Sequence, residues 1–312
     1  MVAQYIYSSS QEWDKAVRQS AAGTFQLLSG YMDYHRHRFH DASLLIANEK
    51  GRTRGVFPAN YADDDTVVSH AGLTYGGLLA DRKSHATDIF QMLNDLCAYY
   101  RANGLKRLIY KAIPAIYHEQ PAEADIYWLH RNGAHLLYRA LSSAVRLQDP
   151  LPFSALRRRG ANKARRASIE VRQSDDLETF WTLLANVLDQ RHHVSPVHTC
   201  DEIQTLYARF PKQITLYAAY LGAEMVGGTL IYADRGVAHA QYIAANEKGR
   251  DIRALDALFT TLIADYKACG FRWFDFGIST AHDGSHLNAG LLAQKEGFGA
   301  RSVCYDTYVL TL

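Results

Sequence analysis

An internal repeat is the feature of this 312-residue sequence that most restricts its fold. Segments 89–104 and 255–270 place apolar residues at the same relative positions, i, i+3, i+4, i+7, i+8 and i+11, and end at Gly104 and Gly270. This spacing is that of the buried side of an amphipathic helix, and glycine commonly follows a helix C-terminus. Because the segments lie 166 residues apart, the sequence predicts the same long helix in each half of the chain.

The repeat extends to both sides of these helices. Residues 43–72 and 214–241 each read as a strand, a tight turn, a long strand, a polar turn and a strand. A buried strand follows each helix, at 105–113 and 271–279, and then a helix, a glycine turn and a final strand. The sequence therefore predicts an α+β protein built from two copies of one unit.

The boundary between the copies is expected near Pro150 and Pro152, because proline interrupts regular structure. The predicted domains are residues 1–150 and 151–312. Each starts with an amphipathic helix that a serine or an aspartate can cap.

The charge is concentrated in one short segment. The chain has 34 Lys and Arg against 32 Asp and Glu, a net charge of +2. Six of the basic residues lie within 157–166, and the remaining 28 basic against 32 acidic residues leave the rest of the chain at −4. Such a pattern favours a local anionic ligand over a surface that coats nucleic acid. The alternative is a solvated helix face without a ligand.

Cysteine usage and hydropathy exclude several classes. The four cysteines are far apart and form no CxxC pair, so neither a disulfide framework nor a zinc site is predicted. The first residues have neither the basic nor the apolar region of a signal peptide. No apolar run approaches the roughly 20 residues of a membrane helix. We therefore expect a cytoplasmic protein without a membrane span.

Several motifs carry a family resemblance. They are SHAGLTYGGLL at 69–79, SPVHTCDEI at 195–203, AHAQYIAANEKGRDIRALDAL at 238–258, FDFGIST at 274–280 and LLAQKEGFG at 291–299. Together they resemble the tandem-GNAT N-acyltransferases of the FemAB/FemX-like branch, in particular the nucleotide-linked amino-sugar N-acyltransferases of surface-polysaccharide biosynthesis. The resemblance implies two tandem GNAT-like domains, the first on the acceptor side and the second on the acyl-donor side.

The resemblance also implies a reaction. An acetyl or 3-hydroxyacyl group, such as 3-hydroxybutanoyl, would pass from acyl-CoA to the amine of a dTDP- or UDP-linked amino sugar for O-antigen or capsule (lipopolysaccharide) biosynthesis. Acyl-CoA would be the co-substrate, and no metal is implied. One alternative is a FemX-like ligase that uses aminoacyl-tRNA on a cell-wall precursor, and tRNA is the nucleic acid expected only in that case. Another is a non-catalytic RNA-binding protein that uses the basic segment. The sequence leaves open whether the protein is a monomer or a dimer.

A donor site is predicted where segment 249–255 joins a strand to the second long helix. Backbone N–H groups at a helix N-terminus and two arginines suit a pyrophosphate, although the same loop could simply lie in solvent. Backbone N–H groups near Tyr242 and Ile243 would hold the oxyanion. The candidate donor-binding residues are Tyr242, Ile243, Gly249, Arg250, Arg253, Ala254 and Leu255.

Three residues are candidates for catalysis. Asp275 stands where the first copy has Ile109, and a carboxylate between two phenylalanines is costly unless it is paired or acts as a base. It could instead be a structural residue bonded to the following loop, where Ser279 lies. His198 could accept a proton from an attacking amine or belong to a structural loop. For Lys295 the resemblance implies contact with a substrate phosphate or the reaction centre, and a salt bridge is the alternative.

Candidate residues that would bind the acceptor substrate come from both copies. In the first copy, paired glycines allow close approach of a ligand and Tyr75 can stack or form a hydrogen bond, unless this segment is only a turn. His70 and His239 occupy equivalent strands, and a duplicated position is more often architectural. The candidate substrate-binding residues are His70, Tyr75, Gly76, Arg158, Arg191 and Ser279.

Overall fold

The computed structural model describes residues 2–4 and 10–312, which form two compact units. Unit 1 contains the chain up to Leu141 with Ala281–His286 and Cys304–Leu312, and unit 2 contains Ser142–Thr280 with Leu287–Val303. These limits differ from the predicted domains 1–150 and 151–312. The reason is that the final strand of each half, β8 (His135–Arg146) and β16 (Arg301–Thr311), has residues in both units.

Unit 2 is built on a continuous twisted sheet. Its strands are β9 (Ile169–Ser174), β10 (Ile214–Leu221), β11 (Glu224–Asp234), β12 (Val237–Ala245) and β13 (Trp273–Ile278). The first four are antiparallel neighbours, β13 runs parallel to β12, and the end of β8 pairs with β13. The β12–β13 pair is parallel, whereas the pairs on either side of it are antiparallel.

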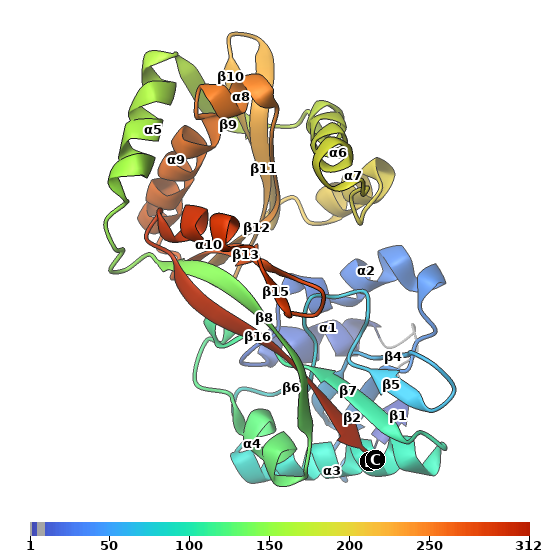
Figure 1. Cartoon of the computed structure of the whole chain (residues 1–312). Coiled ribbons are helices and arrows are strands. Elements are labelled where there is room, and N and C mark those ends of the chain that lie inside the picture. Colours follow the sequence, from blue (N-terminus) through green and yellow to red (C-terminus); the bar gives the residue numbers. More distant parts are fainter. Residues whose placement is uncertain (1, 5–9) are drawn as a thin grey trace. The chain divides into compact units, whose positions relative to one another are not determined.

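Helices cover both faces of this sheet. Figure 1 shows α5 and α9 on one side of β11 and the pair α6 and α7 on the other. The helices of unit 2 are α5 (Ala155–Arg166), α6 (Leu177–His192), α7 (Cys200–Arg209), α8 (Glu247–Asp251), α9 (Ala254–Ala268) and α10 (Ala289–Glu296). Most of the apolar stripe predicted for α9 is buried in the core of this unit, and Gly270 beyond the helix has a φ of +77°. The prediction for this helix is confirmed.

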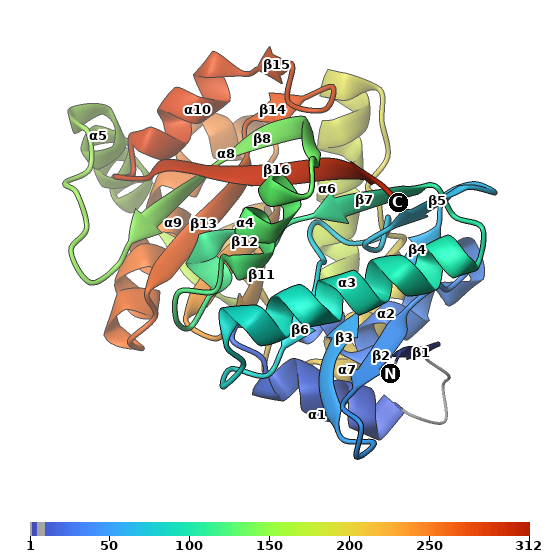
Figure 2. The ribbon, with the colours of Figure 1, turned by 90° about the horizontal axis from the view of Figure 1, so that it is seen from below.

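Unit 1 repeats the order of elements with shorter strands. Its helices are α1 (Ser10–Gln19), α2 (Ser29–Met32), α3 (Ala86–Ala102) and α4 (Ala124–Arg131), with 3-10 turns at Phe25–Leu27, Asp33–Arg38 and Ala115–Tyr117. Its strands are β1 (Val2–Gln4), β2 (Leu44–Ala47), β3 (Thr53–Phe57), β4 (Asn60–Tyr61), β5 (Thr66–Val68), β6 (Leu79–Ala80) and β7 (Arg107–Lys111). Figure 2 shows α3 along its full length beside α4. The two remaining strands are β14 (Thr280–Ala281) and β15 (His286–Leu287).

The two units differ in how the meander is arranged. In unit 1 the strands divide into a sheet of order β1-β2-β3-β6 and a second group, β4-β5-β7, that pairs with the end of β16. Pro58 follows β3 directly, and its missing N–H ends that strand. In unit 2 the corresponding β11 runs on without a proline. Mixed sheets flanked by helices confirm the α+β fold class. None of the helices in the described ranges is long and apolar enough to cross a membrane.

Candidate functional site

The strands β12 and β13 separate in the middle of unit 2. Their parallel pairing covers three residue pairs and ends at His239 opposite Asp275. Beyond that pair β13 bulges, with Gly277 at a φ of +76°, while β12 continues to Ala245. A parallel pair that diverges leaves a gap at the carboxyl ends of its strands, where ligands bind in α/β sheets.

A cavity of about 370 Å³ occupies this region and is called here the β12–β13 cavity. Its aromatic floor is formed by Phe259, Phe276 and Phe298. The other lining residues come from α5, α6, the end of β12, α8, α9 and α10: Arg157, Val187, Leu188, Arg191, Ile243, Ala244, Ala245, Gly249, Arg250, Arg253, Leu255, Asp256, Leu291, Gln294 and Lys295. An apolar hollow with a few convergent charged groups is typical of a ligand site.

The predicted donor loop forms one wall of this cavity. Arg253 precedes α9 with a left-handed backbone, φ 65° and ψ 38°, which is uncommon for a residue other than glycine. Arg250 Nη1 donates to the carbonyl oxygen of Ala245 at 2.9 Å. The first N–H groups of α9 and the cations Arg191, Arg250 and Arg253 together suit an anionic ligand.

Arg157 lies at the same cavity, but its charge is paired. Arg157 Nη1 lies 3.0 Å from Asp256 Oδ1, and the two side chains are only 9% and 4% exposed. Burial raises the pKa of Asp256, and the charge of Arg157 opposes that shift. Gly160 makes the contact possible, since a Cβ there would lie 2.6 Å from the Asp256 carboxyl group. This pair joins α5 to α9.

The rest of the basic segment lies in solvent on α5. Arg158, predicted to bind substrate, is exposed, and its Nη1 donates to the carbonyl oxygen of Phe153 at 2.6 Å. It does not line the β12–β13 cavity. The other exposed cations of α5 are Arg159, Lys163, Arg165 and Arg166. The segment therefore contributes one structural arginine and an exposed positive face.

Lys295 is a buried cation at the bulge of β13. It projects from α10, is 4% exposed, and its Nζ donates to the carbonyl oxygens of Gly277 at 2.8 Å and Ile278 at 2.7 Å. Burial lowers the pKa of Lys295 to about 8, although the nearby charge of Asp275 raises it. Lys295 therefore lines the cavity with an ammonium group that loses its proton at a lower pH than an exposed lysine does.

Asp275 is fully buried, and three hydrogen-bond partners of its carboxyl group lie in unit 2. Ser142 Oγ donates to Oδ1 at 2.7 Å, and the Gly277 N–H donates to the same oxygen at 3.1 Å. Oδ2 lies 2.7 Å from His239 Nδ1. These partners come from β8, β12 and β13 itself. The side chain of Ser279 is not among them, because its buried Oγ has no hydrogen-bond partner in the described part of the chain.

His198 and Tyr242 contact each other. His198 Nδ1 lies 2.5 Å from the Tyr242 hydroxyl, and Tyr242 packs edge-on against Trp181 with ring centroids 5.0 Å apart. His198 is buried just before α7, where Thr199 caps the helix. Neither ring lines the β12–β13 cavity. Ala254 is also absent from its walls, being buried in the first turn of α9.

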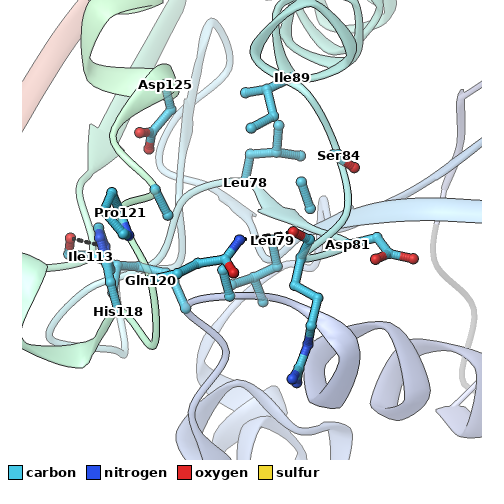
Figure 3. Close-up of a pocket in the computed structure, with 15 residues that line it drawn as sticks. Leu78, Leu79, Asp81, Ser84, Ile89, Ile113, His118, Gln120, Pro121 and Asp125 are labelled. Atoms are coloured by element: carbon cyan, nitrogen blue, oxygen red, sulfur yellow. Dashed lines mark hydrogen bonds between the residues drawn. The ribbon is translucent and has the colours of Figure 1, made fainter.

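Unit 1 has a much smaller cavity in the corresponding place, between β6, α3 and α4. It measures about 60 Å³ and is shown in Figure 3, where Gln120 and His118 donate to backbone carbonyl oxygens. Tyr110 aligns with Phe276 in the repeat, and its hydroxyl donates to Asp125 Oδ2 at 2.6 Å and accepts from a backbone N–H at 2.9 Å. Burial raises the pKa of both side chains. Phe276, which has no hydroxyl to bond in this way, lines the larger cavity of unit 2.

The candidate acceptor residues of unit 1 are buried within it. The Tyr75 hydroxyl donates to Gln26 Oε1 at 2.9 Å, and a Cβ on Gly76 would lie 2.3 Å from a backbone oxygen. Burial, with the charges of His35 and Lys111, lowers the pKa of His70 to about 3. Their role in acceptor binding stays a prediction.

Three residues near the site were not among the sequence candidates: His239, Ser142 and Asp256. Gly160 could have indicated a contact such as that with Asp256, because a glycine inside a helical segment suggests that another side chain packs closely against the helix there. His239 was interpreted as architectural, and only the strand register places it beside Asp275. Within the described ranges, no group of three or more His, Cys, Asp or Glu side chains could hold a metal ion.

Comparison with known proteins follows this geometry. Residues 155–283 match the acetyltransferase (GNAT) domain family. A structure of FemX is 12% identical, with a TM-score of 0.70 over 100% of this chain and 97% of that chain. The C-terminal domain of an Agrobacterium fabrum protein, named as a lysylphosphatidylglycerol synthetase, is 10% identical, with a TM-score of 0.63 over 97% and 91%. L-PGS from Bacillus licheniformis is 14% identical, with a TM-score of 0.59 over 86% and 83%. No curated protein matches the chain in sequence.

The matched family segment and the β12–β13 cavity lie in the same part of the chain. At such identities the structural neighbours establish the fold, and the family match identifies an acetyltransferase domain in unit 2. The β12–β13 cavity is lined almost entirely by residues of the matched segment and by α10. The chain is an acyltransferase.

Proposed function

We propose that the protein transfers an acyl group, acetyl or 3-hydroxyacyl, from acyl-CoA to the amine of a dTDP- or UDP-linked amino sugar used for surface polysaccharide. The observation that carries this proposal is the β12–β13 cavity, which opens where two parallel strands diverge and gathers Arg250, Arg253 and Lys295. An elongated ligand with phosphates at one end and a reactive carbonyl at the other matches that distribution of charge.

Each part of the cavity has a role in the proposed reaction. The arginines and the α9 N-terminus would bind the CoA pyrophosphate, and the aromatic floor would pack against the apolar arm of the donor. Backbone N–H groups near Tyr242 and Ile243, assisted by the Lys295 ammonium, would stabilise the oxyanion that forms when the amine attacks. Arg191 at the cavity and Ser279 nearby are the proposed acceptor contacts in unit 2.

Calorimetry with acetyl-CoA tests the donor site. The double variant Arg250→Ala and Arg253→Ala removes two charge-assisted contacts and should weaken binding by roughly 10²- to 10⁴-fold, since each contact contributes about 1.5–3 kcal/mol. Arg166→Ala on the exposed face of α5 is the matched control and should bind as the wild type does. Equal affinity of the double variant would remove the loop from the donor site.

Turnover identifies the acceptor. A panel of nucleotide-linked amino sugars with several acyl-CoA donors, read by mass spectrometry, should show acylation at one amine. Lys295→Ala should lower that turnover by roughly two orders of magnitude or more with the fold intact, because one oxyanion donor contributes about 3 kcal/mol. Turnover close to wild type would exclude Lys295 from the site.

The exposed positive face of α5 favours a second candidate, an aminoacyl-tRNA-dependent ligase acting on a cell-wall precursor. Exposed arginine and lysine side chains such as Arg159, Lys163 and Arg166 suit a phosphate backbone. This reading requires tRNA binding that falls steeply with salt and is lost when these three residues become alanine. Binding of tRNA without binding of acetyl-CoA would contradict the first proposal.

A further inference from the structure

We propose that His239 is the general base of the acyl transfer and that Asp275 and Ser142 hold it in its proton-accepting form. The inference deepens the proposed function and rests on it. It starts from a buried hydrogen-bonded chain that runs from β8 through β13 to β12 and ends at a ring that is 15% exposed.

Both oxygens of Asp275 are occupied, so it is a positioning residue and not the base itself. Oδ1 accepts from Ser142 Oγ and from the Gly277 N–H, and Oδ2 faces His239 Nδ1. Asp275 is thus a fixed acceptor for a proton on His239.

The acceptor at Oδ2 determines which nitrogen of His239 carries the proton. With Nδ1–H donating to Asp275, the lone pair stays on Nε2, which is the atom able to take a proton. No partner of Nε2 is recorded among the described residues. Gly277 packs against the ring, since a Cβ there would lie 3.3 Å from His239 Cε1, and this contact fixes the orientation of the ring.

The position of His239 suits this role. It is the last residue of β12 paired with β13, so it lies where the two strands begin to separate. The bulge that follows Asp275 also supplies the two carbonyl oxygens that hold Lys295. Asp275, which orients His239, thus directly precedes the turn of β13 that binds Lys295. Tyr232, its register partner on β11, is another titratable residue beside His239.

The proposed step balances as follows. Nε2 of His239 takes one proton from the substrate ammonium group, and the freed amine nitrogen attacks the thioester carbon. The C–N bond forms while the carbonyl π pair moves to oxygen; when that pair returns, the C–S bond breaks and sulfur leaves with its electrons. The second amine proton ends on the thiolate. The products are an amide, CoA thiol and a proton that His239 releases to water.

The tautomer can be measured without any substrate. Nitrogen-15 NMR of the histidine rings in the full chain, with His239→Gln to assign the signal, should show Nδ1 protonated and Nε2 unprotonated above the ionisation of the ring. Asp275→Asn should reverse the tautomer, because the amide offers a donor to the ring. A wild-type ring protonated on Nε2 would overturn the inference.

Kinetics separate a base from a structural residue. The assay is CoA release from acetyl-CoA with glucosamine as the probe amine, beside calorimetry with acetyl-CoA. His239→Ala should lower kcat by about 10²- to 10⁴-fold, leave acetyl-CoA affinity unchanged and abolish the low-pH limb of the kcat/KM profile. Added imidazole should restore part of the rate, which a merely structural role would not allow.

Two further variants serve as a graded comparison and a negative control. Ser142→Ala, which removes one hydrogen bond from Asp275, should cost only about 3- to 10-fold. His37→Ala, an exposed histidine of unit 1, should change nothing. Wild-type protein that fails to bind acetyl-CoA would reject the proposed function, whereas wild-type kinetics in His239→Ala with normal binding would reject only the base.

Discussion

Replacing Lys295 by methionine should change how the stability of the protein depends on pH. The pKa of Lys295 is lowered from 10.5 to about 8 by burial. Between these values the folded chain has released the proton while the unfolded chain keeps it. Because the unfolded state then binds more protons, the free energy of unfolding contributed by Lys295 rises with pH from about 8 to 10.5.

The size of the effect follows from the same shift. A displacement of this size corresponds to about 3 kcal/mol, the cost of keeping the ammonium charged in the fold below pH 8. Near pH 9 nearly one proton separates the two states, which gives a slope of about 1.2 kcal/mol per pH unit. Lys295→Met is close in length and loses this contribution, although two backbone carbonyl oxygens lose their donor.

Urea unfolding at pH 7, 8, 9 and 10 measures the difference between wild type and variant. Lys111 offers a matched control in unit 1, because it is also bonded to backbone oxygens and burial lowers its pKa to about 8. Lys111→Met should lose a similar slope and keep acetyl-CoA turnover, whereas Lys295→Met should lose both. Parallel stability curves for wild type and Lys295→Met would refute the reasoning, since they require an ordinary lysine.

The remaining predictions concern packing around the cavity. Arg157→Ala leaves the buried carboxylate of Asp256 without its partner and should lower stability by about 3–5 kcal/mol, whereas exposed Arg159→Ala should stay within about 0.5 kcal/mol in the same denaturant titration. Gly249→Val places a Cβ 2.1 Å from a backbone oxygen of β11, so it should shift α8 and weaken acetyl-CoA binding in calorimetry. Gly290→Ala has room in α10, its nearest neighbour being an ordinary contact at 3.6 Å, and should raise the melting temperature slightly.

The parts of the fold that sequence could predict are those set by local spacing. The stripe of α9, the glycine beyond it and the loop before Arg253 depend on residues within a few turns of one another. Ile243 and Arg253 were placed at a donor site from the strand-to-helix order and Lys295 from the family resemblance, and all three line the β12–β13 cavity. These predictions needed no knowledge of strand register.

The parts that it could not predict depend on pairing between distant segments. β8 and β16 each have residues in both units, and their pairing partners β13 and β7 lie far away in the sequence, so the boundary expected at Pro150 did not reveal this division. The partner of Asp275 depends on one register between β12 and β13, because a shift by a single residue would put a side chain from the opposite face beside it.

Two neighbouring positions of the repeat differ in chemistry between the units. Asp275 and Phe276 of unit 2 stand where unit 1 has Ile109 and Tyr110, and adjacent strand residues point to opposite faces. In unit 1 the hydroxyl of Tyr110 donates to Asp125, and the cavity beside α4 measures only about 60 Å³. In unit 2 Phe276 lines a cavity of about 370 Å³, while the Asp275 carboxylate on the opposite face of β13 contacts His239. The Asp275–His239 pair has no counterpart at Ile109 of unit 1, so the two copies of the repeat differ at adjacent residues on both faces of this strand.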